Sequence, residues 1–280
     1  EYEQAIQNGL FEDQVDEPAG SGEIRKEEME NKLNSLLART KKMKALLDSK
    51  EILPQATPEI SSEYTHPNGS KETLTLNLEQ KLQEFLSFYQ KTKLDLPPDF
   101  EDIIRNIWEA NQAEIEQAIE QNGFDEILMI PPTPDIGDLS EKMKTENGYY
   151  DWIKSSSNVQ TLNSIPLASP NTDKPRLILV HKAQNLQDRP ELKQTLNIQG
   201  KDVKLDQALT LEDYLVFQRK YFEETKKHLD EDGWTWLATK SGARLVNSYW
   251  HPGDRKLSVN AFDLADWFGN LGVRPSRCFF

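Results

Sequence analysis

The side chains best suited to binding zinc are few and widely spaced. The chain contains one cysteine, Cys278, and four histidines, which are His66, His181, His228 and His251. None of the histidines has a His, Cys, Asp or Glu partner at the spacing of a familiar zinc site. A single cysteine allows neither an intrachain disulfide nor a cysteine-rich zinc site. These residues therefore predict no metal centre.

Two acidic turns place oxygen atoms close together in the sequence. One contains His228, Asp230 and Asp232, and the other contains Asp135 and Asp138. Both lack the alternating oxygens and the distal glutamate of an EF-hand calcium loop. The sequence also contains no P-loop, no Gly-x-Ser-x-Gly motif and no Gly-x-Gly-x-x-Gly motif. We therefore expect a protein that is not an enzyme and that uses no cofactor.

The charge balance excludes several classes of partner. The 280 residues include 33 basic and 47 acidic side chains, which gives a formal net charge of −14. A general nucleic-acid binder needs a basic face, and a polybasic membrane-surface protein needs clustered cations. No apolar run approaches the 18 residues of a membrane span. We expect no nucleic acid and no membrane insertion, and the location stays open between the cytoplasm and a cell or virion surface.

The first 75 residues differ in composition from the rest. Residues 1–23 are predicted to be a disordered acidic tail, and no signal peptide is recognised in a chain that begins at Glu1. Residues 24–53 carry apolar residues at helical spacing from Met29 to Leu47, which predicts an amphipathic helix. This helix either packs on the rest of the protein or mediates self-association. Residues 54–75 are rich in proline and polar residues and are predicted to be a linker.

Residues 76–123 are predicted to form two helices. Apolar residues recur at helical spacing on both sides of Pro97-Pro98, and Asp99 is a suitable N-cap for the second helix. Gly123 follows Asn122 and supplies a left-handed stop. The short connection predicts an antiparallel pair.

Residues 124–280 mix strands and helices, so the predicted fold class is α+β. Ile127–Ile130 and Leu177–Val180 are short apolar runs typical of buried strands. Apolar residues within 138–155 predict a helix, and Thr210 with Asp213 resembles a capping box at the start of another. Period-two alternation in 244–250 and 257–262 predicts two strands joined by a turn.

The segment from 210 to 280 resembles the C-terminal half of a C-type-lectin-fold domain, in particular that of the variable proteins of diversity-generating retroelements. The motifs that carry the resemblance are Leu209–Leu215, His228–Glu231, Gly233–Leu237, Arg244, Trp250–Pro252, Lys256–Asn260 and Leu271–Phe279. The closing Gly272-Val273-Arg274-Pro275 is widespread among bacterial proteins of this fold. Residues 124–209 match only as a plausible first half of the domain, and residues 1–123 are not covered.

The resemblance implies a rigid scaffold with a hypervariable face over about residues 243–280. The retroelement's reverse transcriptase copies a template with errors at adenines, so that the protein becomes a diversified binder of a protein or cell-surface ligand. Alternatives are a fixed interaction module of a phage or surface assembly and an enzyme similar to formylglycine-generating enzymes. That enzyme class uses a cysteine pair, which this chain lacks.

Alternation assigns the two faces of the hairpin. Val246, Trp250, Leu257, Val259 and Ala261 are expected to be scaffold, and Arg274 is expected to support the scaffold through hydrogen bonds. Rigid aromatic side chains and adaptable amides suit a binding surface. The predicted ligand-binding residues are Leu245, Asn247, Tyr249, His251, Asn260, Phe262, Leu264, Trp267 and Phe268. The last three would be core residues in an ordinary protein, but Asp263, Asp266 and Gly269 around them favour display.

Overall fold

The computed structural model describes residues 59–133, 135–143, 154–155, 158–159 and 167–280. The predicted acidic tail, the amphipathic helix of residues 24–53 and self-association through it lie outside the described residues. The part of the predicted 138–155 helix beyond residue 143 also lies outside them, apart from a two-residue strand. The fold below is that of the compact unit Ala56–Phe280.

A β-hairpin stands where a linker was expected, so that prediction is wrong. β1 (Glu59–Thr65) pairs with β2 (Lys71–Asn77) in antiparallel register. Alternate residues point inward, among them Ile60, Tyr64 and Leu76. Pro67 lies in the turn between the strands, where Gly69 takes a positive φ of 85°. The proline and glycine therefore form a tight turn, and the period-two apolar pattern around them forms the strands.

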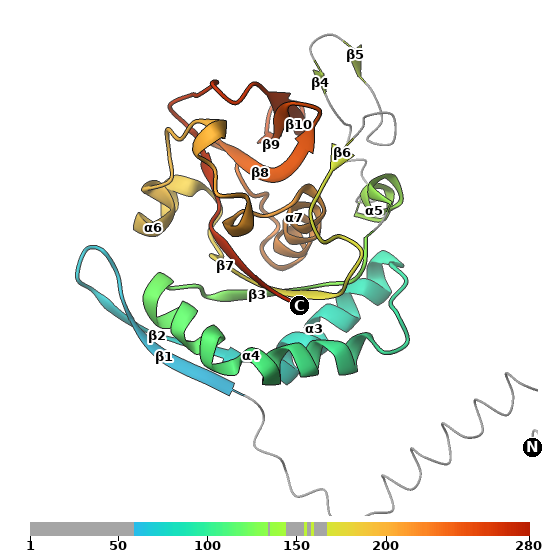
Figure 1. The fold of residues 1–280 in the computed structure, drawn as a ribbon, viewed down its shortest axis with the longest axis vertical. Helices are drawn as coiled ribbons and strands as arrows, with labels where there is room; N and C mark the ends of the chain where they lie inside the picture. The colour runs from blue at the N-terminus through green and yellow to red at the C-terminus, as the bar shows by residue number, and fades with distance from the viewer. Residues whose placement is uncertain (1–58, 134, 144–153, 156–157, 160–166) are drawn as a thin grey trace, which may run out of the picture. The chain divides into compact units, whose positions relative to one another are not determined.

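The predicted helical pair is confirmed. α3 spans Leu78–Thr92, and its N-cap Asn77 accepts a hydrogen bond from Gln80 N at 2.9 Å. α4 spans Phe100–Asn122 and ends at Gly123, whose φ is 69°. Asp99 occupies the N-cap position of α4 without a side-chain hydrogen bond. Both helices cover one face of a small sheet (Figure 1).

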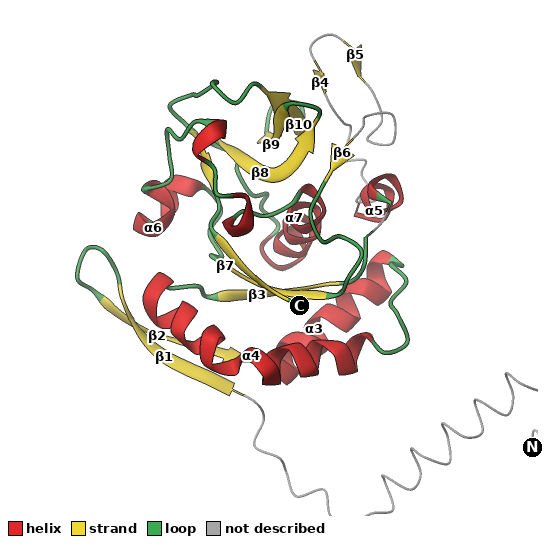
Figure 2. Ribbon diagram, in the orientation of Figure 1, coloured by secondary structure: helices red, strands yellow, loops and turns green. Residues whose placement is uncertain are grey.

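That sheet has three antiparallel strands in the order β12-β7-β3. β3 spans Glu126–Ile130, β7 spans Arg176–Val180 and β12 spans Ser276–Phe279. Every residue of β3 and β7 is buried because α3 and α4 lie on one face and α7 (Leu211–Thr225) lies on the other (Figure 2). The two predicted buried strands are thus confirmed.

The helical pair shares its core with the rest of this unit. One cluster of buried side chains runs from the β1–β2 hairpin through Tyr89 and Trp108 to Phe217 and Phe279. Residue 124 therefore does not separate two hydrophobic cores. The pair of helices is an integral layer of the domain.

A second sheet lies on the other side of α7. Its path is β10-β9-β8-β11, and β6 (Leu167–Ala168) also pairs with β8. The remaining strands are β8 (Trp234–Ser241), β9 (Arg244–His251), β10 (Lys256–Phe262) and β11 (Leu271–Val273). β11 runs parallel to β8, and the other pairings are antiparallel. The predicted hairpin of residues 244–262 is confirmed.

The remaining elements are short. α5 spans Ile136–Met143, β4 (Lys154–Ser155) pairs with β5 (Asn158–Val159), and α6 spans Pro190–Lys193. In the described part of the chain, 3-10 turns occupy Leu186–Asp188, Gly200–Asp202 and Leu205–Gln207. The mixture of helices and largely antiparallel sheets is α+β, as predicted. No helix in the described parts of the chain has the length and apolar character needed to cross a membrane.

Candidate ligand-binding surface

The two faces of the β9–β10 hairpin have different environments. Val246, Trp250, Leu257 and Val259 belong to the main core beneath it, and Ala261 packs against that core. These five scaffold assignments are confirmed. The capping box of α7 is also present, with Thr210 and Asp213 each accepting from the other's backbone N–H.

The opposite face carries the residues predicted to bind a ligand. Leu245 lies opposite Phe262, Asn247 opposite Asn260, and Tyr249 opposite Ser258. Trp236 of β8 lies opposite Asn247 on the other side. Directly opposed residues in an antiparallel pair project to the same side, so these side chains share one face.

Two of the predicted binding residues are buried, and their assignment to the display surface is wrong. Leu245 is 1% exposed and Asn247 is 0% exposed. Leu245 packs with Trp236, Val203 and Leu271 in a second hydrophobic cluster. The segment from 198 to 208 supplies part of that cluster, so it covers this end of the face. Alternation identifies which residues share a face but not which distant segment packs on it.

The other seven predicted residues are exposed or half-buried. Trp267 is 58% exposed, Phe268 46% and Leu264 40%. His251 is exposed, and Tyr249, Asn260 and Phe262 are half-buried. We call these seven residues together with Trp234 the aromatic surface. The set is Trp234, Tyr249, His251, Asn260, Phe262, Leu264, Trp267 and Phe268.

Ring contacts join most of this surface. Trp234 stacks on Tyr249 with ring centroids 4.8 Å apart, and its ring centroid is 5.8 Å from that of Phe262. Phe262 contacts Phe268 at 5.3 Å, and Tyr249 contacts His251 at 5.6 Å. Trp234 was not predicted from the sequence, although its period-two relation to Trp236 is the signal that could have identified it.

A buried ion pair fixes the strands that carry the surface. Arg274 donates to Asp230 from Nε at 3.1 Å and from Nη2 at 2.7 Å. Its guanidinium also donates to the carbonyl oxygens of Ala183 and Gln184 at 2.9 and 2.7 Å. Both charged residues are almost fully buried. Arg274 is therefore part of the scaffold, as expected.

Asp230 accepts two further hydrogen bonds that tie α7 to β8. Tyr214 Oη and Thr235 Oγ1 donate to its Oδ2 at 2.9 and 2.8 Å. Gly272, two residues before Arg274, lies so close to its neighbours that a Cβ there would come within 2.8 Å of both Leu186 Cδ1 and Thr195 O. The Gly-Val-Arg-Pro motif thus combines a close backbone approach with a buried charge pair.

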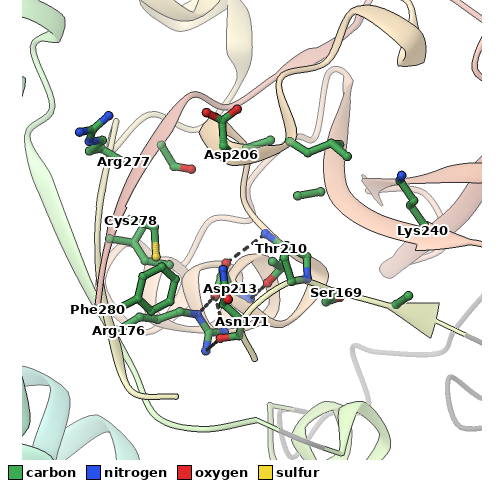
Figure 3. A pocket seen from close by; sticks show the side chains of 17 residues that line it. Ser169, Asn171, Arg176, Asp206, Thr210, Asp213, Lys240, Arg277, Cys278 and Phe280 are labelled. Atoms are coloured by element: carbon green, nitrogen blue, oxygen red, sulfur yellow. Dashed lines mark hydrogen bonds and ion pairs between the residues drawn. The ribbon is translucent and has the colours of Figure 1, made fainter. Parts of the chain in front are cut away.

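A separate hollow of about 650 Å³ lies between the loop after β6 and strand β12 (Figure 3). At its floor Arg176 donates from Nε to Asp213 at 2.8 Å, and Thr210 N donates to the same carboxylate at 3.0 Å. Cys278 lines the hollow, and burial raises the pKa of its thiol to about 12. The Asp213 carboxylate already accepts hydrogen bonds from Arg176 and Thr210, and the Cys278 thiol stays protonated near neutral pH. Neither group is therefore activated for nucleophilic attack.

The histidines do not converge on one site. His181 and His228 are buried, and burial lowers the pKa of each to about 4. His66 contacts Glu191 at 2.9 Å and Glu72 at 3.1 Å, and His251 is exposed beside Asp254. Within the described ranges, no group of three or more His, Cys, Asp or Glu side chains is arranged to hold a metal ion.

Family models, curated proteins and solved structures were each compared with this chain, and none of them matches it. A function is therefore inferred from the residues and their arrangement.

Proposed function

We propose that this chain is a ligand-binding display protein whose aromatic surface contacts a protein or cell-surface ligand. One observation carries the proposal. Among the described residues, four large hydrophobic side chains are exposed, and three of them, Leu264, Trp267 and Phe268, lie in one loop. That loop continues the half-buried rings of β8, β9 and β10. Phe268 contacts Phe262 of β10, and a group of exposed apolar side chains on a strongly acidic chain is typical of a binding site.

We further propose that retroelement mutagenesis diversifies this surface. The support is that one face of the β9–β10 hairpin packs on the core while side chains of the other face are exposed or half-buried. Trp250 and Leu257 hold the hairpin on the core, whereas Tyr249 and His251 point away from it. Substitutions at the exposed and half-buried outer positions therefore leave the packing of the inner side intact, whereas Leu245 and Asn247 on the same outer side are buried.

The same proposal assigns residues 124–280 to the C-type-lectin fold. Its support is the structural role of the residues that resemble that family. Arg274 and Asp230 form the buried pair that joins three segments, and Trp236 is fully buried on the same sheet face as Leu245 and Asn247. Motif residues that fix a scaffold are what the resemblance implies.

Sequencing the source locus tests this function directly. We expect a near-copy of the DNA that encodes about residues 243–280, with mismatches confined to template adenines, and a neighbouring reverse-transcriptase gene. A locus with neither feature would overturn diversification. A fixed interaction module with the same aromatic surface would then be the better assignment.

A further inference from the structure

The stacked Trp234–Tyr249 ring pair follows a turn that carries two carboxylate residues. The centroids are 4.8 Å apart, the planes are tilted by 26°, and both rings are half-buried. Glu231 and Asp232 immediately precede β8, and Asp232 is exposed. Asn185 Nδ2 donates to Asp232 Oδ2 at 3.5 Å, a long and weak hydrogen bond. The carboxylate of Asp232 therefore remains available to a ligand.

Two negative charges act on the phenol of Tyr249. Partial burial raises the pKa of the Tyr249 phenol, and the charges of Asp232 and Glu231 raise it further. Neither carboxylate forms an ion pair with any of the described residues. Arg244 lies at the start of β9, far from Tyr249, and pairs with Asp263 at 3.0 Å. The exposed Arg255 and Lys256 lie closer to Tyr249, at the turn between β9 and β10.

An aromatic pair next to an unpaired carboxylate suits a cationic group. Ring faces of Trp and Tyr attract Lys and Arg through their quadrupoles, by about 0.5–2 kcal/mol depending on exposure. A carboxylate adds a charge-assisted hydrogen bond. The net charge of −14 also favours encounter with a basic partner.

We propose that Trp234, Tyr249 and Asp232 form a subsite for a lysine or arginine side chain of a protein ligand. This subsite rests on the proposed function, because it lies at one end of the same aromatic surface. Two of its three residues precede residue 243, so they belong to the constant scaffold. Tyr249 lies in the proposed variable segment, so the complete subsite is present only in variants that keep an aromatic side chain at this position.

A random dodecamer peptide library displayed on phage and panned against the full chain tests this subsite. Peptides retained by a Trp267→Ala/Phe268→Ala variant are first removed. We expect the remaining peptides to be enriched in Lys or Arg. For the tightest of them, made as a free peptide, replacing its basic residue by citrulline or norleucine should weaken binding about fivefold or more.

Matched variants of the chain locate the contact. Asp232→Asn and Tyr249→Leu should each weaken binding of that peptide about fivefold, whereas Tyr249→Phe keeps the ring and should stay within about twofold. Asp173→Asn removes another exposed carboxylate, in the turn before β7, and should also change affinity by less than about twofold. Near-ultraviolet circular dichroism checks that each variant is folded.

The outcomes separate the subsite from the proposed function. Peptides that need Trp267 and Phe268 but carry no basic residue, or that bind the Asp232→Asn variant unchanged, would overturn the subsite and leave the binding surface standing. If no peptide depends on Trp267 and Phe268, both the surface and the subsite are wrong.

Discussion

Individual residues near the end of this chain show how burial decides the role of a side chain. Arg274 and Arg277 are three positions apart and both pair with a carboxylate. The first pair is 2% and 0% exposed, and the second, with Glu114, is 52% and 59% exposed. A buried charge without its partner is costly, whereas an exposed pair contributes little.

Replacing the two arginines should therefore reduce the free energy of unfolding by very different amounts. Arg274→Ala should lower the free energy of unfolding by about 3–5 kcal/mol, because it leaves Asp230 charged and buried. Arg277→Ala should lower it by less than about 1 kcal/mol. Urea denaturation followed by tryptophan fluorescence measures both. Similar losses for the two variants would contradict a structural role for the Asp230–Arg274 pair.

Asn247 predicts a gain in stability on substitution. Its side chain is fully buried, and neither amide atom has a hydrogen-bond partner. A buried polar group without a partner costs about 1–3 kcal/mol. Asn247→Leu keeps the number and branching of the side-chain heavy atoms and removes the unpaired amide, so it should raise the free energy of unfolding by about 1 kcal/mol. Half-buried Asn260→Leu should change it by less than about 0.5 kcal/mol. A clear loss of stability in Asn247→Leu would show that the amide has a favourable role.

His181 predicts a loss of stability in acid. Burial, with smaller effects of Arg189 and Arg274, lowers the pKa of this side chain from 6.5 to about 4. Between pH 6.5 and 4 the unfolded chain therefore binds the proton and the folded chain does not, so stability falls as the pH falls through this window. Each unit of pKa is worth about 1.4 kcal/mol.

Denaturation at several pH values tests this effect. His181→Phe should make the decline in unfolding free energy between pH 6.5 and 4 shallower, whereas exposed His251→Gln should leave it unchanged. An identical decline in His181→Phe and the unsubstituted chain would exclude His181 as a source of the pH dependence.

At the scale of elements, local patterns identified the three long helices and four of the strands that the structure describes. Apolar spacing and end signals predicted α3, α4, β3, β7, the capping box of α7 and the β9–β10 hairpin. The β1–β2 hairpin was missed because Pro54, Pro58 and Pro67 outweighed an alternating pattern in short strands. Leu245 was misplaced because the segment that covers it lies about forty residues earlier, a distance over which local patterns carry no information.

The β1–β2 hairpin contacts the end of α4 at Gly123, so we expect a side chain at this position to reduce the stability of the fold. Gly123 has a φ of 69°, and a Cβ there would come within 2.3 Å of the Tyr64 ring. Gly69 has a φ of 85° and open space around it. Gly69→Ala should lower the free energy of unfolding by about 1–2 kcal/mol through backbone strain. Gly123→Ala should lower it by about 1–3 kcal/mol more than Gly69→Ala does, because its Cβ also meets the Tyr64 ring.

Thermal unfolding of both variants measures the difference. If the two variants have equal melting temperatures, then Tyr64 does not rest against the end of α4 as described.

At the scale of the whole described unit, one hydrophobic core joins elements from β1 to β12. α3 and α4 cover a face of the β12-β7-β3 sheet that would otherwise be exposed. We therefore expect residues 56–280 to unfold in one cooperative transition, with far-ultraviolet circular dichroism and tryptophan fluorescence changing together. A fragment of residues 124–280 should lack the dispersed amide NMR spectrum of a folded domain. Separate transitions, or a folded fragment, would show that the helical pair is an independent domain.

The aromatic surface was partly foreseen from the sequence. Period-two alternation and the acidic residues around Trp267 placed seven of its residues on the outside. The sequence did not predict that a distant segment covers Leu245 and Asn247. It also did not predict that Trp234, on the neighbouring strand β8, stacks on Tyr249. Both depend on contacts between segments distant in the chain.

Sequencing the gene for this chain from many cells of one population tests the central claim most directly. If the aromatic surface is a diversified binding site, differences should concentrate at exposed or half-buried positions such as Tyr249, His251, Trp267 and Phe268. The core positions Val246, Trp250, Leu257 and Val259 should stay unchanged. Differences spread evenly over both sets, or a sequence identical in every cell, would contradict the claim.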